Sequence, residues 1–132
     1  MKQPSLVIVE DEMSLALALT NFAEELGYQV LAMANTELSA VETVLKRQPD
    51  VVLMDIHLAG GNGLGAAMAI RRKSKVPIVF CTSYASNTKI RADVLKLGNT
   101  ALIGKPIDEA ELADILASAV KGDTENANNE YC

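Results

Sequence analysis

Three short apolar runs constrain the fold of this chain more than any other feature. They are Leu6–Val9, Val51–Met54 and Ile78–Cys81, and none of them alternates apolar with polar residues. Strands that are apolar on both faces are typical of a parallel sheet buried between two layers of helices. Tyr28–Ala32 and Ala101–Ile103 are shorter and weaker runs, and we expect them to form strands toward the edges of the same sheet.

The segments between these runs have helical periodicity, so that strands and helices alternate along the chain. In the first of them, Leu15, Leu19, Phe22 and Leu26 fall on one helical face. Caps, glycines and prolines mark where the five expected helices begin and end. The first helix ends at Gly27, and the second begins at the Thr36 cap and ends before Pro49. The third and fourth helices are expected over residues 64–72 and 88–97, and Gly98 ends the fourth. The fifth begins at the Asp108 cap, with Glu111 three residues later.

Five strands alternating with five helices predict an α/β fold, in which one parallel sheet has helices on both faces and right-handed crossovers. A chain of 132 residues has the length of one domain. We assign residues 1–121 to this domain. Residues 122–132, GDTENANNEYC, are polar and without periodicity, and we expect them to form a disordered tail.

The charge balance argues against a nucleic acid or a membrane as a direct partner. The chain has 12 basic and 17 acidic residues, and its one basic cluster, Arg71-Arg72-Lys73, falls where a helix is expected to end. The first apolar run is too short for a signal sequence or a membrane span. Cys81 lies inside an apolar run and Cys132 ends the tail, so we expect reduced thiols and a cytoplasmic protein.

Reactive side chains follow four of the five predicted strands. The carboxyl ends of parallel strands point to one edge of the sheet, and ligands bind there, at the point where the strand order reverses. We therefore expect acids, a hydroxyl and an ammonium group to converge at this edge. The segments concerned are Glu10-Asp11-Glu12, Asp55, Thr82-Ser83 and Gly104-Lys105-Pro106.

Such a cluster suits magnesium and phosphoryl transfer. Crowded carboxylates repel one another until a proton or a cation relieves the repulsion. Magnesium prefers one or two carboxylates, several waters and a phosphate oxygen. Asp55 can then act as a nucleophile that forms an acyl phosphate, with Lys105 and Thr82 contacting the phosphoryl oxygens. Pro106 fixes the turn that carries Lys105 and is a candidate for a cis peptide bond.

The motifs VIVEDE, VVLMDIHLAGGNG, PIVFCTS and GKP occur in this order and at suitable intervals. Together they resemble the receiver domain of two-component response regulators, from residue 5 to about residue 120. The resemblance implies a flavodoxin-like, doubly wound (βα)5 fold with strand order 2-1-3-4-5. It also implies a signalling phosphoacceptor rather than an enzyme, which is phosphorylated by a histidine kinase or a phosphotransfer protein and then switches the binding of a downstream protein. The domain would be a monomer or a phosphorylation-dependent dimer, either free-standing or excised from a longer protein.

The resemblance assigns a role to each matching position. Asp55 is the phosphoacceptor. Magnesium is the implied cofactor, and its implied protein ligands are Asp11, Asp55, the backbone carbonyl of His57 and, through a water, Glu10. Thr82 and Lys105 are implied to contact the phosphoryl group.

One position departs from the family pattern. Receivers usually carry Tyr or Phe three residues before the lysine, where this chain has Leu102. The segment FCTSY, residues 80–84, is similar to the Phe-Ala-Thr-Gly-Tyr motif of a receiver subgroup that also lacks the aromatic residue. This similarity implies that the signal passes through the loop after Thr82 and the fourth helix. We further hypothesise that His57 and Tyr84 flank the path of the hydrolytic water and set the lifetime of phospho-Asp55.

Other readings of these residues remain open at this point. Asp55 alone could be a solvated carboxylate at a strand end, and Glu12 is expected to be only a favourable acid in a first helical turn. Residues 61–66 fit a dinucleotide fingerprint but lie too far from their strand, and we interpret the glycines as a flexible loop that admits the phosphoryl donor. A haloacid-dehalogenase-like magnesium phosphatase would also use Asp55 as its nucleophile, but it needs a second acid where this chain has His57. A scaffold with a vestigial acidic pocket is the third alternative.

Overall fold

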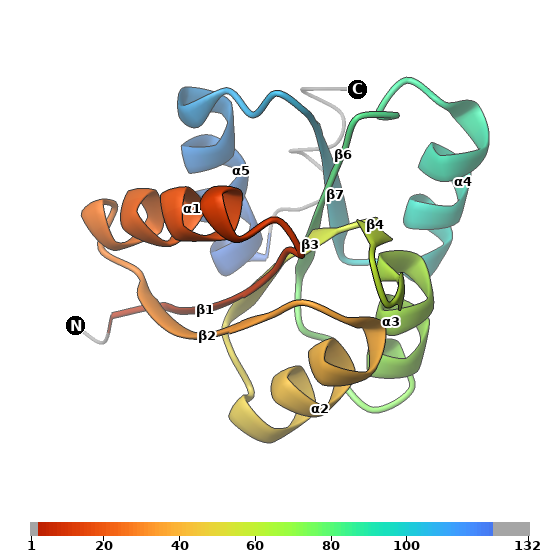
Figure 1. Cartoon of the computed structure of the whole chain (residues 1–132), viewed down its shortest axis with the longest axis horizontal. Coiled ribbons are helices and arrows are strands. Elements are labelled where there is room, and N and C mark those ends of the chain that lie inside the picture. The colour runs from red at the N-terminus through yellow and green to blue at the C-terminus, as the bar shows by residue number, and fades with distance from the viewer. Residues whose placement is uncertain (1–2, 123–132) are drawn as a thin grey trace.

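The computed structural model describes residues 3–122 of the chain. In it, a five-stranded parallel sheet lies between two layers of helices (Figure 1). The order β2-β1-β3-β6-β7 corresponds to 2-1-3-4-5 when only the sheet strands are counted, which confirms the predicted topology. The two weaker apolar runs form the edge strands, as expected. The strands are β1 (Ser5–Val9), β2 (Gln29–Ala34), β3 (Val51–Asp55), β6 (Ile78–Thr82) and β7 (Thr100–Gly104).

All five helices form where the periodicity predicts them. Thr36 makes a reciprocal capping box with Ser39, and the Asp108 side chain accepts a hydrogen bond from the Glu111 backbone N–H. Gly98 follows the fourth helix with a positive φ of 72°, which glycine adopts without strain. The helices are α1 (Met13–Glu25), α2 (Glu37–Arg47), α3 (Gly63–Arg71), α4 (Thr88–Leu97) and α5 (Glu109–Lys121).

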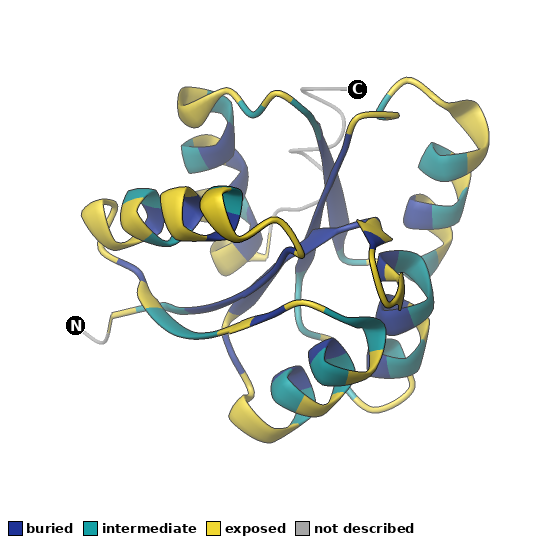
Figure 2. Cartoon of the chain, viewed as in Figure 1, coloured by how far each residue is buried: buried dark blue, intermediate teal, exposed yellow. Residues whose placement is uncertain are grey.

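The two faces of the sheet bury separate sets of side chains. Helices α1 and α5 cover one face, where Leu6 and Ile8 of β1 lie in one core cluster with Leu116 of α5. Helices α2, α3 and α4 cover the other face, where Val7 packs in a second cluster that includes Ile70. The sheet is therefore buried on both sides (Figure 2), which is the physical reason for its unbroken apolar runs.

The segment between β3 and α3 was not predicted in detail. It forms a small antiparallel ribbon of β4 (His57–Leu58) and β5 (Gly61–Asn62), and Gly60 forms a bridge to Thr36 at the start of α2. The glycines here are packed closely: Gly63 lies against the backbone of Asp55, and Gly65 lies against the Glu37 side chain. These glycines thus permit close approach of neighbouring segments, a role that our interpretation of a flexible loop admitting the phosphoryl donor did not include.

The remaining predictions concern the two cysteines, the peptide bond before Pro106, the C-terminal tail and membrane spans. Cys81 is a buried core residue, as predicted, and burial raises the pKa of its thiol. The peptide bond between Lys105 and Pro106 is cis. Cys132 and nearly all of the expected tail lie beyond residue 122, outside the described part. Between residues 3 and 122, no helix is both long enough and apolar enough to cross a membrane.

Candidate functional site

Three carboxylates meet at the carboxyl edge of the sheet. Glu10 and Asp11 follow β1, and Asp55 ends β3, the neighbouring strand. One carboxylate oxygen from each residue lies within 4.8 Å of the other two. Glu10 and Asp55 are only 4% and 5% exposed, whereas Asp11 is open to solvent. The edge thus presents a cluster of oxygen ligands with one accessible side.

Lys105 completes this cluster from β7, the edge strand two positions away from β3. Its Nζ lies 3.0 Å from Glu10 Oε1 and 3.1 Å from Asp55 Oδ2, forming two partly buried ion pairs. The Lys105 backbone N–H donates to the Thr82 carbonyl oxygen over 2.9 Å, which fixes the start of the turn against β6. One ammonium group therefore partly neutralises two carboxylates that would otherwise repel each other.

The environment shifts the pKa values of two of these groups. Burial raises the pKa of Glu10 above its usual value, and the nearby charge of Asp55 adds to this, although hydrogen bonds from Glu12 and Lys105 act in the opposite direction. Burial alone would lower the pKa of Lys105, but its bonds to Glu10 and Asp55 outweigh burial and raise it. The ammonium form of Lys105 is thus favoured, whereas the charged form of Glu10 is disfavoured.

Backbone N–H groups of the loop that follows β3 donate hydrogen bonds to two of the carboxylates. Asp55 Oδ1 accepts from the His57 N–H over 3.2 Å, and Asp11 Oδ2 accepts from the Ala59 N–H over 2.6 Å. Asp11 therefore links the end of β1 to the loop after β3. Neither of these bonds was predicted, because each joins a site carboxylate to a backbone group whose direction depends on the fold of the loop.

Thr82 and the two residues proposed to flank the site also lie at this edge. Thr82 is fully buried, and its hydroxyl oxygen accepts a hydrogen bond from the Tyr84 backbone N–H over 3.0 Å. The rings of Tyr84 and His57 make an edge-to-face contact, with centroids 5.1 Å apart and planes inclined by 75°. This contact joins the loop after β6 to the loop after β3.

Glu12 was expected to be a favourable acid in the first turn of α1, but it is the N-cap residue of that helix and its side chain makes no capping hydrogen bond. Glu12 is exposed at the start of α1, where its backbone N–H donates to Glu10 Oε2 over 3.0 Å, while its own carboxylate stays outside the acidic cluster. Leu102, at the position where receivers usually have an aromatic ring, is buried in the core cluster under α2, α3 and α4.

Glu37 is a residue near the site that sequence reasoning missed. Its carboxylate oxygen Oε1 accepts from the Asn62 backbone N–H over 2.8 Å, although 25 positions separate the two residues. Only the four glycines of the GGNGLG segment hinted at a close approach to this loop, and their spacing does not identify the approaching side chain.

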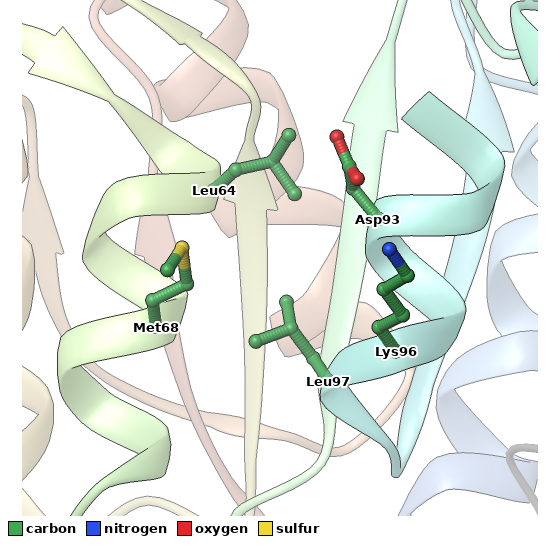
Figure 3. A pocket seen from close by; sticks show the side chains of 5 residues that line it. All are labelled: Leu64, Met68, Asp93, Lys96 and Leu97. Atoms are coloured by element: carbon green, nitrogen blue, oxygen red, sulfur yellow. The ribbon is translucent and has the colours of Figure 1, made fainter. Parts of the chain in front are cut away.

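An apolar groove of about 270 Å³ lies away from this cluster, between α3 and α4 (Figure 3). Leu64 and Met68 form one wall, and Leu97 lies across from them. Its two charged residues, Asp93 and Lys96, come from α4 and carry opposite charges. The groove holds none of the acidic cluster, so we assign it no chemistry.

The chain matches known proteins along most of its length. A family model described as the response regulator receiver domain matches residues 6–117. The phyllosphere-induced regulator PhyR of Methylorubrum extorquens is 31% identical over 119 residues, which make up 87% of this chain and 43% of PhyR. The chain spans about half the length of the curated regulators that it matches.

Solved structures agree with this family. The receiver domain of PhyR from Erythrobacter litoralis is 30% identical with a TM-score of 0.80, and the match covers 92% of each chain. The receiver domain of the sensor histidine kinase PA1611 from Pseudomonas aeruginosa is 27% identical with a TM-score of 0.80, over 91% of this chain and 99% of that one. That receiver was solved with a magnesium ion coordinated in its active-site cleft. Sequence, topology and site thus lead to one conclusion: this chain belongs to the response regulator receiver domain family of two-component signalling.

Proposed function

We propose that this receiver accepts a phosphoryl group on Asp55 in a magnesium-dependent reaction and thereby changes its binding to a downstream protein. The observation that carries the proposal is the convergence of Glu10, Asp11 and Asp55 within 4.8 Å, with Lys105 Nζ 3.1 Å from the Asp55 carboxylate. The donor would be a phosphohistidine on a histidine kinase or on a phosphotransfer protein.

The donor set fits magnesium, because it consists of hard oxygen atoms with one side open to water. Asp11, Asp55 and the backbone carbonyl of His57 would hold the ion directly, and Glu10 would hold it through a water. When bound, the ion would neutralise negative charge on the three cluster carboxylates and on the phosphoryl oxygens. The magnesium ion in the PA1611 receiver supports this assignment.

The chain's own residues would then orient the transfer. A carboxylate oxygen of Asp55 attacks phosphorus, the bond to the donor histidine nitrogen breaks, and its electron pair returns to the imidazole. Lys105 lies close enough to Asp55 to place its ammonium beside the phosphoryl oxygens. The buried Thr82 hydroxyl would donate a hydrogen bond to one of them.

Thr82 also suggests how the signal leaves the site. Its hydroxyl oxygen accepts from the Tyr84 N–H, so a movement of Thr82 toward a phosphoryl group would pull on the loop that leads to α4. Leu102 offers no aromatic ring to rotate. We therefore propose that the loop after Thr82 and α4 carry the change to a protein partner, either downstream or a second copy of the receiver.

Incubation with magnesium and a small phosphodonor tests the proposal by intact-mass spectrometry. The receiver should gain one phosphoryl group as an acyl phosphate that base removes, and Asp55→Asn should gain none while keeping its fold by circular dichroism. Asp114→Asn, at an exposed position on α5, is the control and should be labelled like the parent chain. Label retained on Asp55→Asn would identify a different acceptor. Release of phosphate without any lasting acyl phosphate would support a phosphatase, and neither label nor phosphate release from any form would leave only a scaffold.

A further inference from the structure

The loop between β3 and α3 is anchored by a carboxylate on each side. On one side, Asp11 Oδ2 accepts from the Ala59 N–H over 2.6 Å. On the other, Glu37 Oε1 accepts from the Asn62 N–H over 2.8 Å. Asp11 belongs to the acidic cluster, but Glu37 lies at the first position of α2 and outside that cluster.

The Glu37 carboxylate is not needed to cap its own helix. Thr36 and Ser39 already make a reciprocal capping box at the start of α2. The Glu37 backbone N–H also binds the loop and not its own helix, since it donates to the Gly60 carbonyl oxygen over 2.9 Å. Both the backbone and the side chain of Glu37 are therefore directed to the loop that follows Asp55.

Two glycines leave room for this carboxylate. A Cβ atom at Gly65 would lie 2.8 Å from Glu37 Oε2, and one at Gly61 would lie 2.7 Å from Glu37 Oε1. Contacts this short would force the carboxylate to move. Gly61 also has a positive φ of 111°, whereas Gly65 lies within the regular helix α3. The missing Cβ of Gly65 thus leaves the space that the Glu37 carboxylate occupies.

We propose that Glu37 is a positioning residue for magnesium binding and phosphorylation. It holds the segment between Ile56 and Asn62, which carries the His57 carbonyl and the Ala59 N–H, in the arrangement that the acidic cluster requires. Without Glu37, that segment would have to be ordered each time the ion binds, and this cost lowers affinity. The inference rests on the proposed function, because it assumes that the cluster binds magnesium.

Calorimetric titration of the unphosphorylated chain with magnesium tests the inference. Glu37→Ala should weaken magnesium binding roughly tenfold. Glu37→Gln keeps an oxygen that can accept from the Asn62 N–H, and its affinity should stay within about twofold of the parent's. Glu42→Ala removes an exposed acid from the same helix and is the matched control, with unchanged affinity.

Gly65→Ala separates positioning from stability. Alanine favours a helix over glycine, and the group it displaces is the mobile end of a side chain, so the melting temperature without magnesium should stay the same or rise. Magnesium affinity should nevertheless fall roughly tenfold, as in Glu37→Ala. The double variant Glu37→Ala/Gly65→Ala should bind no more weakly than either single variant, because both remove one interaction.

Three results would overturn the inference: an unchanged affinity in Glu37→Ala, an equal loss in Glu37→Gln, or additive losses in the double variant. Should Glu37→Ala fail to fold, an unchanged affinity in Gly65→Ala would have the same meaning. Asp11→Asn separates the role of Glu37 from the proposed binding of magnesium by the acidic cluster. If it abolishes binding while the Glu37 variants bind normally, the proposed function stands and only the role of Glu37 falls. If the parent chain binds no magnesium, both fall.

Discussion

Glu10 is a buried member of the cluster, and its surroundings disfavour its charged form. Burial and the charge of Asp55 raise its pKa, despite the hydrogen bonds from Glu12 and Lys105. A raised folded-state pKa means that the folded protein binds the Glu10 proton more tightly than the unfolded chain does. This group therefore adds stability below its unfolded pKa of about 4.5, and that stability is lost as pH rises through the folded value.

Glu10→Gln should consequently stabilise the magnesium-free protein at pH 7, because glutamine resembles the protonated acid. Each unit by which the pKa is raised corresponds to about 1.4 kcal/mol of unfolding free energy. Urea unfolding in a chelator at several pH values measures the difference, which should shrink toward zero as pH falls to about 4.5. A variant that is less stable than the parent at pH 7 would mean that the Lys105 ion pair outweighs the cost of burial.

His57 and Tyr84 make a separate prediction at this scale. Their rings are in contact across the loops after β3 and β6, and the hypothesis is that together they would restrict the access of water to phosphorylated Asp55. Replacing both with alanine should shorten the lifetime of phospho-Asp55 by several-fold, as followed by loss of label after removal of the donor. Leu95→Ala, an exposed apolar position on α4, is the control. An unchanged dephosphorylation rate in the double variant would exclude this role.

At the scale of elements, the sequence was sufficient for the sheet and its helices but not for their connections. Runs such as Val51–Met54 and caps such as Thr36 are local signals, and they placed the five strands of the parallel sheet and the five helices that cover it. The ribbon of β4 and β5 was missed because its two-residue strands are too short for periodicity. Glu37 was missed because its partner Asn62 is distant in sequence, and only the folded chain brings them together.

Arg71 is a second long-range connection, and the sequence suggested only a favourable charge at the end of α3. Its guanidinium donates to the carbonyl oxygens of Ser74, Val76, Gly98 and Asn99, over distances between 2.6 and 3.3 Å. It thus joins the loop after α3 to the loop after α4, at the edge of the sheet opposite the acidic cluster. Burial of the guanidinium lowers its pKa.

Arg71→Ala should reduce the unfolding free energy by about 3 kcal/mol, because hydrogen bonds from a charged donor are lost and carbonyl groups are left unpaired. The neighbouring Arg72 is exposed, and Arg72→Ala should change stability by less than about 0.5 kcal/mol. Denaturant unfolding of both variants gives the comparison. Equal effects of the two substitutions would show that charge at the end of the helix, and not the bonds between loops, accounts for the contribution of Arg71.

At the scale of the whole molecule, the parallel sheet explains why so few residues define the site. Strands β1, β3 and β7 all run in one direction, so Asp11, Asp55 and Lys105 reach one edge although they are far apart in sequence. The same convergence places three carboxylates together, and a single ammonium group offsets only part of their mutual repulsion. The folded state therefore carries electrostatic repulsion that a divalent cation would relieve, and the unfolded chain, in which the acids are dispersed, does not.

Magnesium should accordingly raise the melting temperature. A ligand that binds only the folded state at a hundredfold excess over its Kd adds about 2.7 kcal/mol of stability, which corresponds to a rise of roughly 10 °C for a domain of this size. Asp11→Asn should lose most of the rise, because it removes the exposed carboxylate of the cluster, and a chelator should reverse the rise in the parent chain. Sodium chloride at matched ionic strength controls for general screening of the acidic surface. An equal rise in Asp11→Asn, or with sodium chloride alone, would mean that the stabilisation comes from diffuse counterions and not from an ion held by these three strands.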